Sequence, residues 1–167
     1  MQTAKTVAIT LTALILVILA VCYGLLKSGS LSARKKPGSV EYAIANYALD
    51  LSIPAAAKSA RNPIAATSEA LLAGSKSFSE NCAVCHGNDG AAKTNTAKGL
   101  SPEVPDLKAE RVQKLPDGQM FYLVKNGIRF TGMPGWDLRD EQIWKLVLVI
   151  RQFAKEPASS ESGKGPS

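Results

Sequence analysis

The sequence predicts an all-α protein in which one transmembrane helix precedes a small helical domain. Residues 7–26 contain no charged side chain and are mostly aliphatic. Segments near residues 67–85, 117–126 and 140–154 have the apolar spacing or the flanking residues of helices. We therefore expect the folded domain to occupy residues 67–155.

Composition divides the remainder of the chain. Residues 1–6 form a short N-terminal tail, and residues 27–66 form a basic linker that several prolines interrupt. The tail at residues 156–167 is mostly Ser, Gly, Pro and Lys. We expect this tail to be disordered, because it has nothing apolar to bury.

The apolar run at residues 7–26 fits a membrane anchor. Its twenty residues would form a helix of about 30 Å, the thickness of the hydrocarbon core of a bilayer. A cleaved signal peptide normally has a shorter apolar region and a small-x-small cleavage site. Cys22 follows Leu19-Ala20-Val21 as in a bacterial lipoprotein, but Val21 is bulky for that position. We favour an uncleaved anchor over these alternatives and interpret Cys22 as a packing residue.

One stretch of the linker has helical periodicity. Apolar residues recur at helical intervals, which predicts a short amphipathic helix that Pro54 ends: Val40, Ile44, Tyr47, Ala48 and Leu51. Such a helix would belong to a spacer between the bilayer and the domain. The same pattern fits a helix that packs on the domain or on the membrane surface.

Most of the positive charge lies outside the predicted domain. The formal net charge is +6, and residues 1–66 contribute +5 of it. A basic stretch beside a bilayer meets anionic head groups. Nucleic-acid-binding proteins instead have a basic stripe interleaved with aromatic residues. The sequence lacks such a stripe, so we exclude nucleic acid as a partner.

The chemistry of the chain is concentrated in one motif, Cys82-Ala83-Val84-Cys85-His86. The pattern C-x-x-C-H attaches c-type haem, because two thiols three positions apart form thioethers with one edge of the porphyrin. The next side chain then reaches the iron. His86 has no competitor, since it is the only histidine of the chain. The motif predicts one haem c, covalently held by Cys82 and Cys85, with His86 as an iron ligand.

Two other interpretations of the cysteines fit less well. A thioredoxin-like pair would follow a β-strand, and no strand-like run precedes Cys82. A structural zinc site needs about four ligands. The chain has three cysteines and one histidine, and Cys22 lies inside the apolar run.

A methionine is the expected sixth ligand of the iron, if a side chain supplies it. Met133 lies in the segment TGMPG at residues 131–135, where glycines and a proline produce an irregular loop that can direct one side chain inward. Met120 lies in a predicted helix, and Met1 lies before the anchor. We favour Met133, whose thioether would raise the reduction potential relative to a second imidazole. The alternative is an open or exchangeable site.

With these residues in place, the predicted domain resembles the class I monohaem cytochromes c, in the bacterial form with an N-terminal membrane anchor. Gly74 and Phe78 precede the motif as in that family, where the glycine lets the first helix cross the last one closely and the aromatic ring fills the joint. The segment VPDL at residues 104–107 is similar to the family's Gly-Pro-Asn-Leu. The resemblance implies that the Pro105 carbonyl accepts a hydrogen bond from the ligand histidine and that Leu107 packs on the porphyrin.

The resemblance also implies a C-terminal helix that begins near Asp140. A tyrosine often stands in that family where this chain has Val149. We therefore expect a reduced aromatic contact at the helix crossing, part of which Trp144 would replace unless it is an ordinary core residue. Trp136, just after the methionine loop, would lie near the haem edge.

The implied architecture is a cytochrome c fold, with three to four helices and loops around one haem, preceded by a single transmembrane helix. Its implied function is one-electron transfer between membrane redox complexes or other carriers of a respiratory chain, not catalysis. The chain would be either a tethered carrier or a subunit of a larger assembly. A haem enzyme or gas sensor would instead need a vacant sixth site, and a structural subunit would need the haem only for assembly.

Two signals disagree about orientation. Four basic residues lie within residues 27–36, after the apolar run, and Lys5 alone precedes it. The positive-inside rule would therefore place the domain in the cytoplasm. However, c-type haem is attached on the outer side of the energy-transducing membrane. We give more weight to the haem, because attachment is a location-dependent chemical event, and expect a periplasmic domain on the inner (cytoplasmic) membrane.

Overall fold

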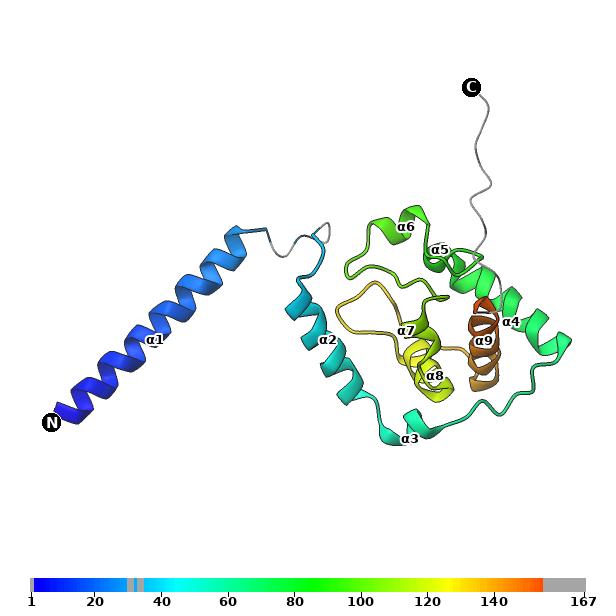
Figure 1. The fold of residues 1–167 in the computed structure, drawn as a ribbon, viewed down its shortest axis with the longest axis horizontal. Helices are drawn as coiled ribbons and strands as arrows, with labels where there is room; N and C mark the ends of the chain where they lie inside the picture. The colour runs from blue at the N-terminus through cyan, green and yellow to red at the C-terminus, as the bar shows by residue number, and fades with distance from the viewer. Residues whose placement is uncertain (1, 30–31, 33–34, 155–167) are drawn as a thin grey trace, which may run out of the picture. The chain divides into compact units, whose positions relative to one another are not determined.

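The computed structural model describes residues 2–29, 32 and 35–154, and these ranges contain helices and no strand (Figure 1). The predicted all-α fold class is confirmed. The chain divides into two units, Met1–Lys35 and Lys36–Ser167, which we describe separately. The tail predicted at residues 156–167 lies outside the described residues.

The first unit contains one long helix, α1 (Gln2–Lys27). An 18-residue window of its segment Lys5–Lys27 has a mean hydropathy of 2.7, and within the described part of the chain this is the one helix long and apolar enough to cross a membrane. The large apolar side chains of α1 are more than half exposed. Near its end, Lys27 Nζ lies 5.8 Å from the centre of the Tyr23 ring. Aromatic and cationic side chains are common at the ends of membrane-spanning helices.

The second unit is a helical domain. Its longer helices are α2 (Ser39–Ser52), α4 (Ser68–Asn81), α8 (Asp117–Asn126) and α9 (Asp140–Phe153). Its short helices are α3 (Ala55–Ser59), α5 (Ala83–His86), α6 (Asn95–Lys98) and α7 (Glu110–Gln113). The helices predicted within the domain correspond to α4, α8 and α9, and the linker helix corresponds to α2.

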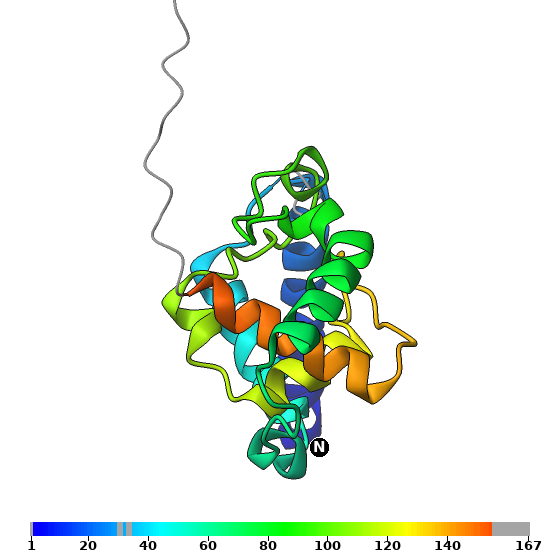
Figure 2. The same ribbon diagram turned by 90° about the vertical axis from the view of Figure 1, so that its right-hand side faces the viewer.

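The close crossing of α4 and α9 forms the centre of the domain (Figure 2). A Cβ atom on Gly74 would lie 2.6 Å from the carbonyl oxygen of Lys145, so the two backbones approach this closely only at a glycine. Next to this contact, the rings of Phe78 and Phe153 meet edge to face with centres 5.1 Å apart. Phe153 is therefore the aromatic partner at the crossing, which the sequence comparison at Val149 did not reveal.

Trp144 does not replace the missing tyrosine at that crossing. Its ring stacks on the ring of Phe121 in α8, with centres 4.3 Å apart. It therefore packs α8 against α9, as an ordinary partly buried residue of the apolar core. The largest fully buried side chains of the second unit all lie on α9, and they are Ile143, Leu146 and Val147.

The end of the predicted linker packs on the domain. The side chain of Ile53 is only 3% exposed. The N–H of Gly118 donates to the carbonyl of Ala60 at 3.1 Å, and a Cβ atom on Gly118 would overlap α3. The side-chain amide of Asn62 donates to the carbonyl of Trp144 at 2.9 Å. This part of the expected spacer is docked because its alanines are small enough to lie against the glycine of α8.

Candidate functional site

The C-x-x-C-H motif forms the turn that follows α4. The N–H of Cys82 donates to the carbonyl of Phe78 at 2.8 Å and thereby ends that helix. The N–H of His86 donates to the carbonyl of Cys82 at 2.9 Å, which closes the single turn of α5. Cys82 and Cys85 are half-buried and not joined by a disulfide. One turn therefore presents two thiols and an imidazole.

The thiol of Cys82 does not have the properties of a redox-active thiolate. Burial, with a smaller contribution from Cys85, raises the pKa of Cys82 to about 11. Reactive cysteines of thioredoxin-like pairs have a lowered pKa instead. Among the described residues, no group of three or more His, Cys, Asp or Glu side chains could hold a metal ion, so the structure does not support a zinc site either.

The ring of His86 is largely enclosed. Burial lowers the pKa of His86, and the backbone carbonyl of Pro105 opposes this shift as an acceptor beside the ring. Nδ1 is nevertheless buried without a partner at full hydrogen-bond geometry, so the contact with the carbonyl is long or bent. A neutral imidazole is the form that binds a metal. The unsatisfied buried nitrogen fits a ring that iron would hold in place through its other nitrogen.

The loop that carries Pro105 is tied to the turn after the motif. The N–H of Leu107 donates to the carbonyl of Gly90 at 2.8 Å. Gly90 has a φ of +74°, and a Cβ atom there would lie 2.7 Å from the Phe153 ring, so this position requires glycine. Leu107 is buried in the same core cluster as Phe78 and Phe153.

Met133 lies in the loop between α8 and α9, half-buried and packed against the core. The N–H of Met133 donates to the hydroxyl of Thr131 at 3.1 Å. The carbonyl of Met133 accepts from the N–H of Ile128 at 3.1 Å. The neighbouring Gly132 lies directly against Leu100, because a Cβ atom there would be 2.6 Å from the leucine side chain. The methionine loop thus contacts the loop that leads to Pro105.

The other methionine of the domain has a different environment. Met120 is 3% exposed and belongs to the core cluster on α8. Its side chain fills space among apolar neighbours, as the predicted helix implied. The structure therefore places the Pro105 carbonyl beside the His86 ring and the Met133 loop against Leu100, whereas Met120 is a buried member of the core, against which Met133 packs as a partly buried residue.

Sequence reasoning did not identify a polar clamp behind the site. The side-chain amide of Gln113 donates to the carbonyls of Leu107 and Ile150, at 2.7 and 2.9 Å. Arg151 forms an ion pair with Asp117 at 2.7 Å and donates to the carbonyls of Gln113 and Leu115. These bonds hold the segment after Leu107 against α9. Apart from the bond between Gln113 and Leu107, these bonds join residues more than thirty positions apart, so no local signal predicts them.

Part of the helical domain is similar to known proteins. The family model described as cytochrome c oxidase, cbb3-type, subunit III matches residues 69–148. A search of curated proteins found no match. Among solved structures, a reducing HAO-like protein complex of Kuenenia stuttgartiensis is similar at 22% sequence identity, with a TM-score of 0.51. The alignment covers 55% of this chain and 46% of that chain, so this protein spans less than half of that chain's length, and the likeness concerns the fold.

Proposed function

We propose that this chain is a membrane-tethered one-electron carrier. The premise is that residues 69–148 form a c-type cytochrome domain with a covalent haem. A domain of this type makes the chain an electron-transfer protein rather than an enzyme, although it can be part of a larger oxidoreductase. The bound haem supplies a one-electron ferric/ferrous couple.

The observation that carries the proposal is the single turn that presents Cys82, Cys85 and His86 beside the Pro105 carbonyl. In this proposal the two thiols form the thioethers and His86 is the proximal ligand. A hydrogen bond from Nδ1 to Pro105 would leave the other ring nitrogen for iron and would increase its basicity. Leu107, buried next to the attachment turn, would pack on the porphyrin.

Met133 is the proposed sixth ligand. It is half-buried on an irregular loop that contacts Leu100, whereas Met120 is committed to the core. Soft sulfur favours ferrous iron, so thioether ligation would raise the reduction potential relative to bis-imidazole ligation. A ligand on both faces of the iron also suits outer-sphere transfer better than chemistry at an open site.

The proposed setting is the inner (cytoplasmic) membrane, with α1 as a single-pass anchor and the domain facing the periplasm. The support for the anchor is the length and hydropathy of Lys5–Lys27. The support for the orientation is the side of the membrane on which c-type haem is attached. Membrane redox complexes of a respiratory chain, or other carriers, would be the donor and acceptor. The haem domain is proposed to comprise residues 67–155, with the docked end of the linker as its support.

The test is to record the optical spectra and the potential of the full chain, produced with a haem-attachment system. Met133→Ala is compared with Met120→Leu, a volume-conserving change at the other methionine of the domain. We expect low-spin haem with a methionine-to-ferric-iron band, which Met133→Ala abolishes with a fall in potential and Met120→Leu retains. High-spin haem that binds carbon monoxide readily and does not respond to Met133→Ala would reject the carrier in favour of a gas sensor or enzyme.

A further inference from the structure

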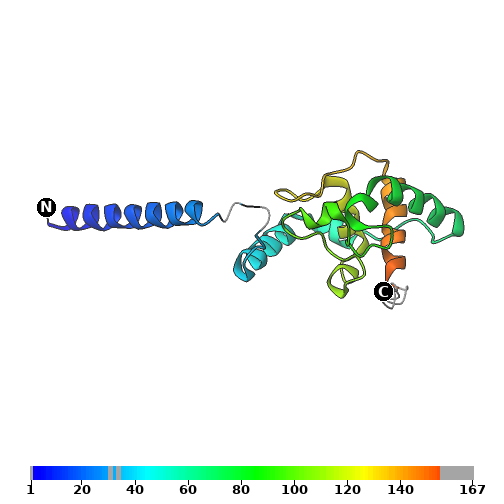
Figure 3. The ribbon, with the colours of Figure 1, turned by 90° about the horizontal axis from the view of Figure 1, so that it is seen from above.

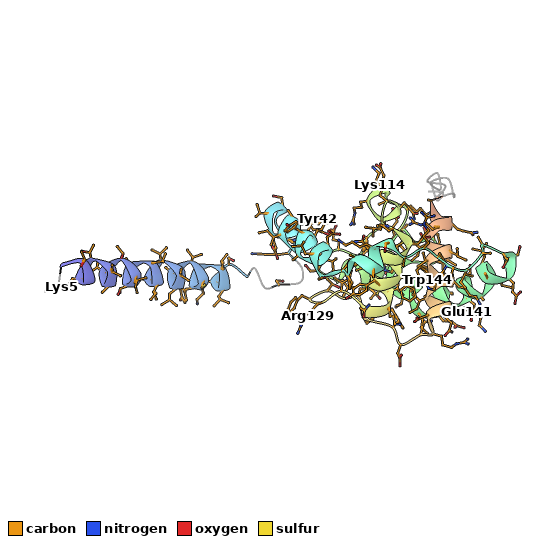
Figure 4. The ribbon with its side chains drawn as sticks, turned by 90° about the horizontal axis from the view of Figure 1, so that it is seen from below. Lys5, Tyr42, Lys114, Arg129, Glu141 and Trp144 are labelled. Atoms are coloured by element: carbon orange, nitrogen blue, oxygen red, sulfur yellow. The ribbon has the colours of Figure 1, made fainter. Side chains whose placement is uncertain are left out.

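The helix α2 contacts the rest of the domain along one side, although none of its own residues is fully buried. On the covered side, Leu49 is half-buried and Ile53, just after the helix, is 3% exposed. The hydroxyl of Tyr42 on the same side accepts a hydrogen bond from Arg111 Nη1 at 3.1 Å. This face therefore holds α2 to the domain, at whose periphery the helix lies (Figures 3 and 4).

The opposite face presents a continuous apolar stripe. Its residues recur at steps of four, three and four, and at 100° per residue their centre lies roughly 170° from the side that contacts the domain. They are large, uncharged and exposed by 63–70%: Val40, Ile44, Tyr47 and Leu51. Four such side chains in one row exceed the scattered single exposure that is normal for a protein surface.

The charged residues of α2 lie beside this stripe and interact with residues close to them in the sequence. Glu41 accepts a hydrogen bond from the N–H of Gly38 at 3.4 Å, at the start of the helix. Asp50 forms an ion pair with Lys58 at 2.8 Å. Neither carboxylate lies within the apolar stripe. The helix therefore has separate apolar and charged faces, as do helices that lie in the membrane–water interface.

The position of α2 in the chain indicates what covers the stripe. The candidate span ends at Lys27 and α2 begins at Ser39. A fully extended connection of this length reaches about 40 Å at most, so α2 cannot leave the neighbourhood of the bilayer surface. The connection carries basic residues, which anionic head groups attract. Tyr47, a residue type enriched at the membrane–water interface, lies in the middle of the stripe.

We propose that α2 lies in the plane of the membrane, with Val40, Ile44, Tyr47 and Leu51 at the boundary between head groups and acyl chains. The inference rests on the proposed role of α1 as an anchor. A lipid surface fits better than a second copy of the chain, because a stable protein interface buries about 800 Å² per partner and a row of four side chains is short for that. The domain is then seated on the bilayer through α2, with a defined side toward it, instead of hanging from a spacer.

The experiment uses the haem-loaded full chain in vesicles of phosphatidylcholine and anionic phosphatidylglycerol, with Cys22→Ser so that one introduced cysteine is the only free thiol. An environment-sensitive NBD fluorophore is attached at Ile44→Cys. Matched probes are placed at Leu14→Cys in α1 and at Leu72→Cys, an exposed leucine of α4. Each probe is quenched separately by iodide in the water and by lipids that carry a nitroxide on the acyl chain.

The inference predicts that the Ile44 probe, like the Leu14 probe, is quenched mainly by the nitroxide lipid and emits at shorter wavelength than the Leu72 probe. Quenching by iodide at Ile44, with lipid quenching at Leu14, would overturn it while leaving the anchor intact. Protection of Ile44 from both quenchers would overturn it in favour of a covering protein, such as a second copy. Iodide quenching at Leu14 as well would reject the anchor and the inference together.

Discussion

Replacing Gly74 by alanine sets two physical effects against each other. In a helix interior, alanine is more stable than glycine by about 0.8–1.0 kcal/mol. At Gly74, however, the new Cβ atom would lie 2.6 Å from the Lys145 carbonyl oxygen and 2.9 Å from Val149 Cγ2. The first atom belongs to the backbone of α9, so no side-chain rotation relieves the contact. The sign of the change in stability therefore reports how closely α4 and α9 approach.

The expected magnitude follows from the separation needed. Normal contact between carbon and oxygen would require α4 and α9 to move apart by roughly 0.6 Å, and a gap of that size forfeits about a quarter to a half of the dispersion energy across it. Overpacking of this kind costs about 1–3 kcal/mol. After subtraction of the gain in helix propensity, we expect a net loss of up to about 2 kcal/mol. Each kcal/mol corresponds to about 4–8 °C in the melting temperature of a small domain.

The assay is thermal unfolding of the haem-loaded full chain in detergent, followed by Soret absorbance. Gly99→Ala is the matched control, because a Cβ atom there would have only an ordinary contact at 3.6 Å, with the carbonyl of Thr96. We expect Gly74→Ala to melt below the wild type and Gly99→Ala to melt at or above it. If Gly74→Ala melted at or above the wild type, the close backbone approach of α4 and α9 would be refuted.

Two further predictions concern charged side chains on α9. Arg151→Met should lower the free energy of unfolding by about 2–3 kcal/mol, because it leaves Asp117 and the carbonyls of Gln113 and Leu115 without their donor. Unfolding in guanidinium measures this free energy, and a change below about 0.5 kcal/mol would contradict the prediction. The hydrogen bond from Lys145 and the charge of Lys145 lower the pKa of Glu141 from its ordinary value of 4.5. The stability that ionised Glu141 contributes is therefore present above pH 4.5 and is lost as the pH falls through the lower pKa of the folded state. The stability difference between wild type and Glu141→Gln should accordingly be constant above pH 4.5 and shrink below it, and a difference that persists in acid would refute the linkage.

The helices could be predicted from sequence because their signals are local. The apolar periodicity of α2 and α9 and the uncharged run of α1 each lie within one element. The haem-attachment motif is local as well, since Cys82 and His86 occupy one turn. The close crossing of two helices at Gly74 was predicted from the family resemblance, and the structure has this contact.

Contacts between distant residues could not be predicted in the same way. The pairing of Phe78 with Phe153 depends on how far α9 continues past the aligned position, which spacing alone does not determine. The docking of the linker was missed for a different reason. A segment rich in alanine and proline is typical of a spacer, and only the structure shows that Gly118 leaves room for it. The bond from the Gln113 amide to the Ile150 carbonyl likewise joins residues that are distant in sequence.

The docked segment before α4 also has a mechanical consequence. Tension along the chain from its N-terminal side meets the contacts of Tyr42 and Ile53 first, and then the hydrogen bond of Ala60 with Gly118 and the bond from Asn62 to the Trp144 carbonyl. Through these contacts the force reaches α8 and α9 before it reaches α4. The turn Cys82-His86 lies beyond them, so thermal motion of a tethered domain is absorbed before it strains the groups that would hold the iron.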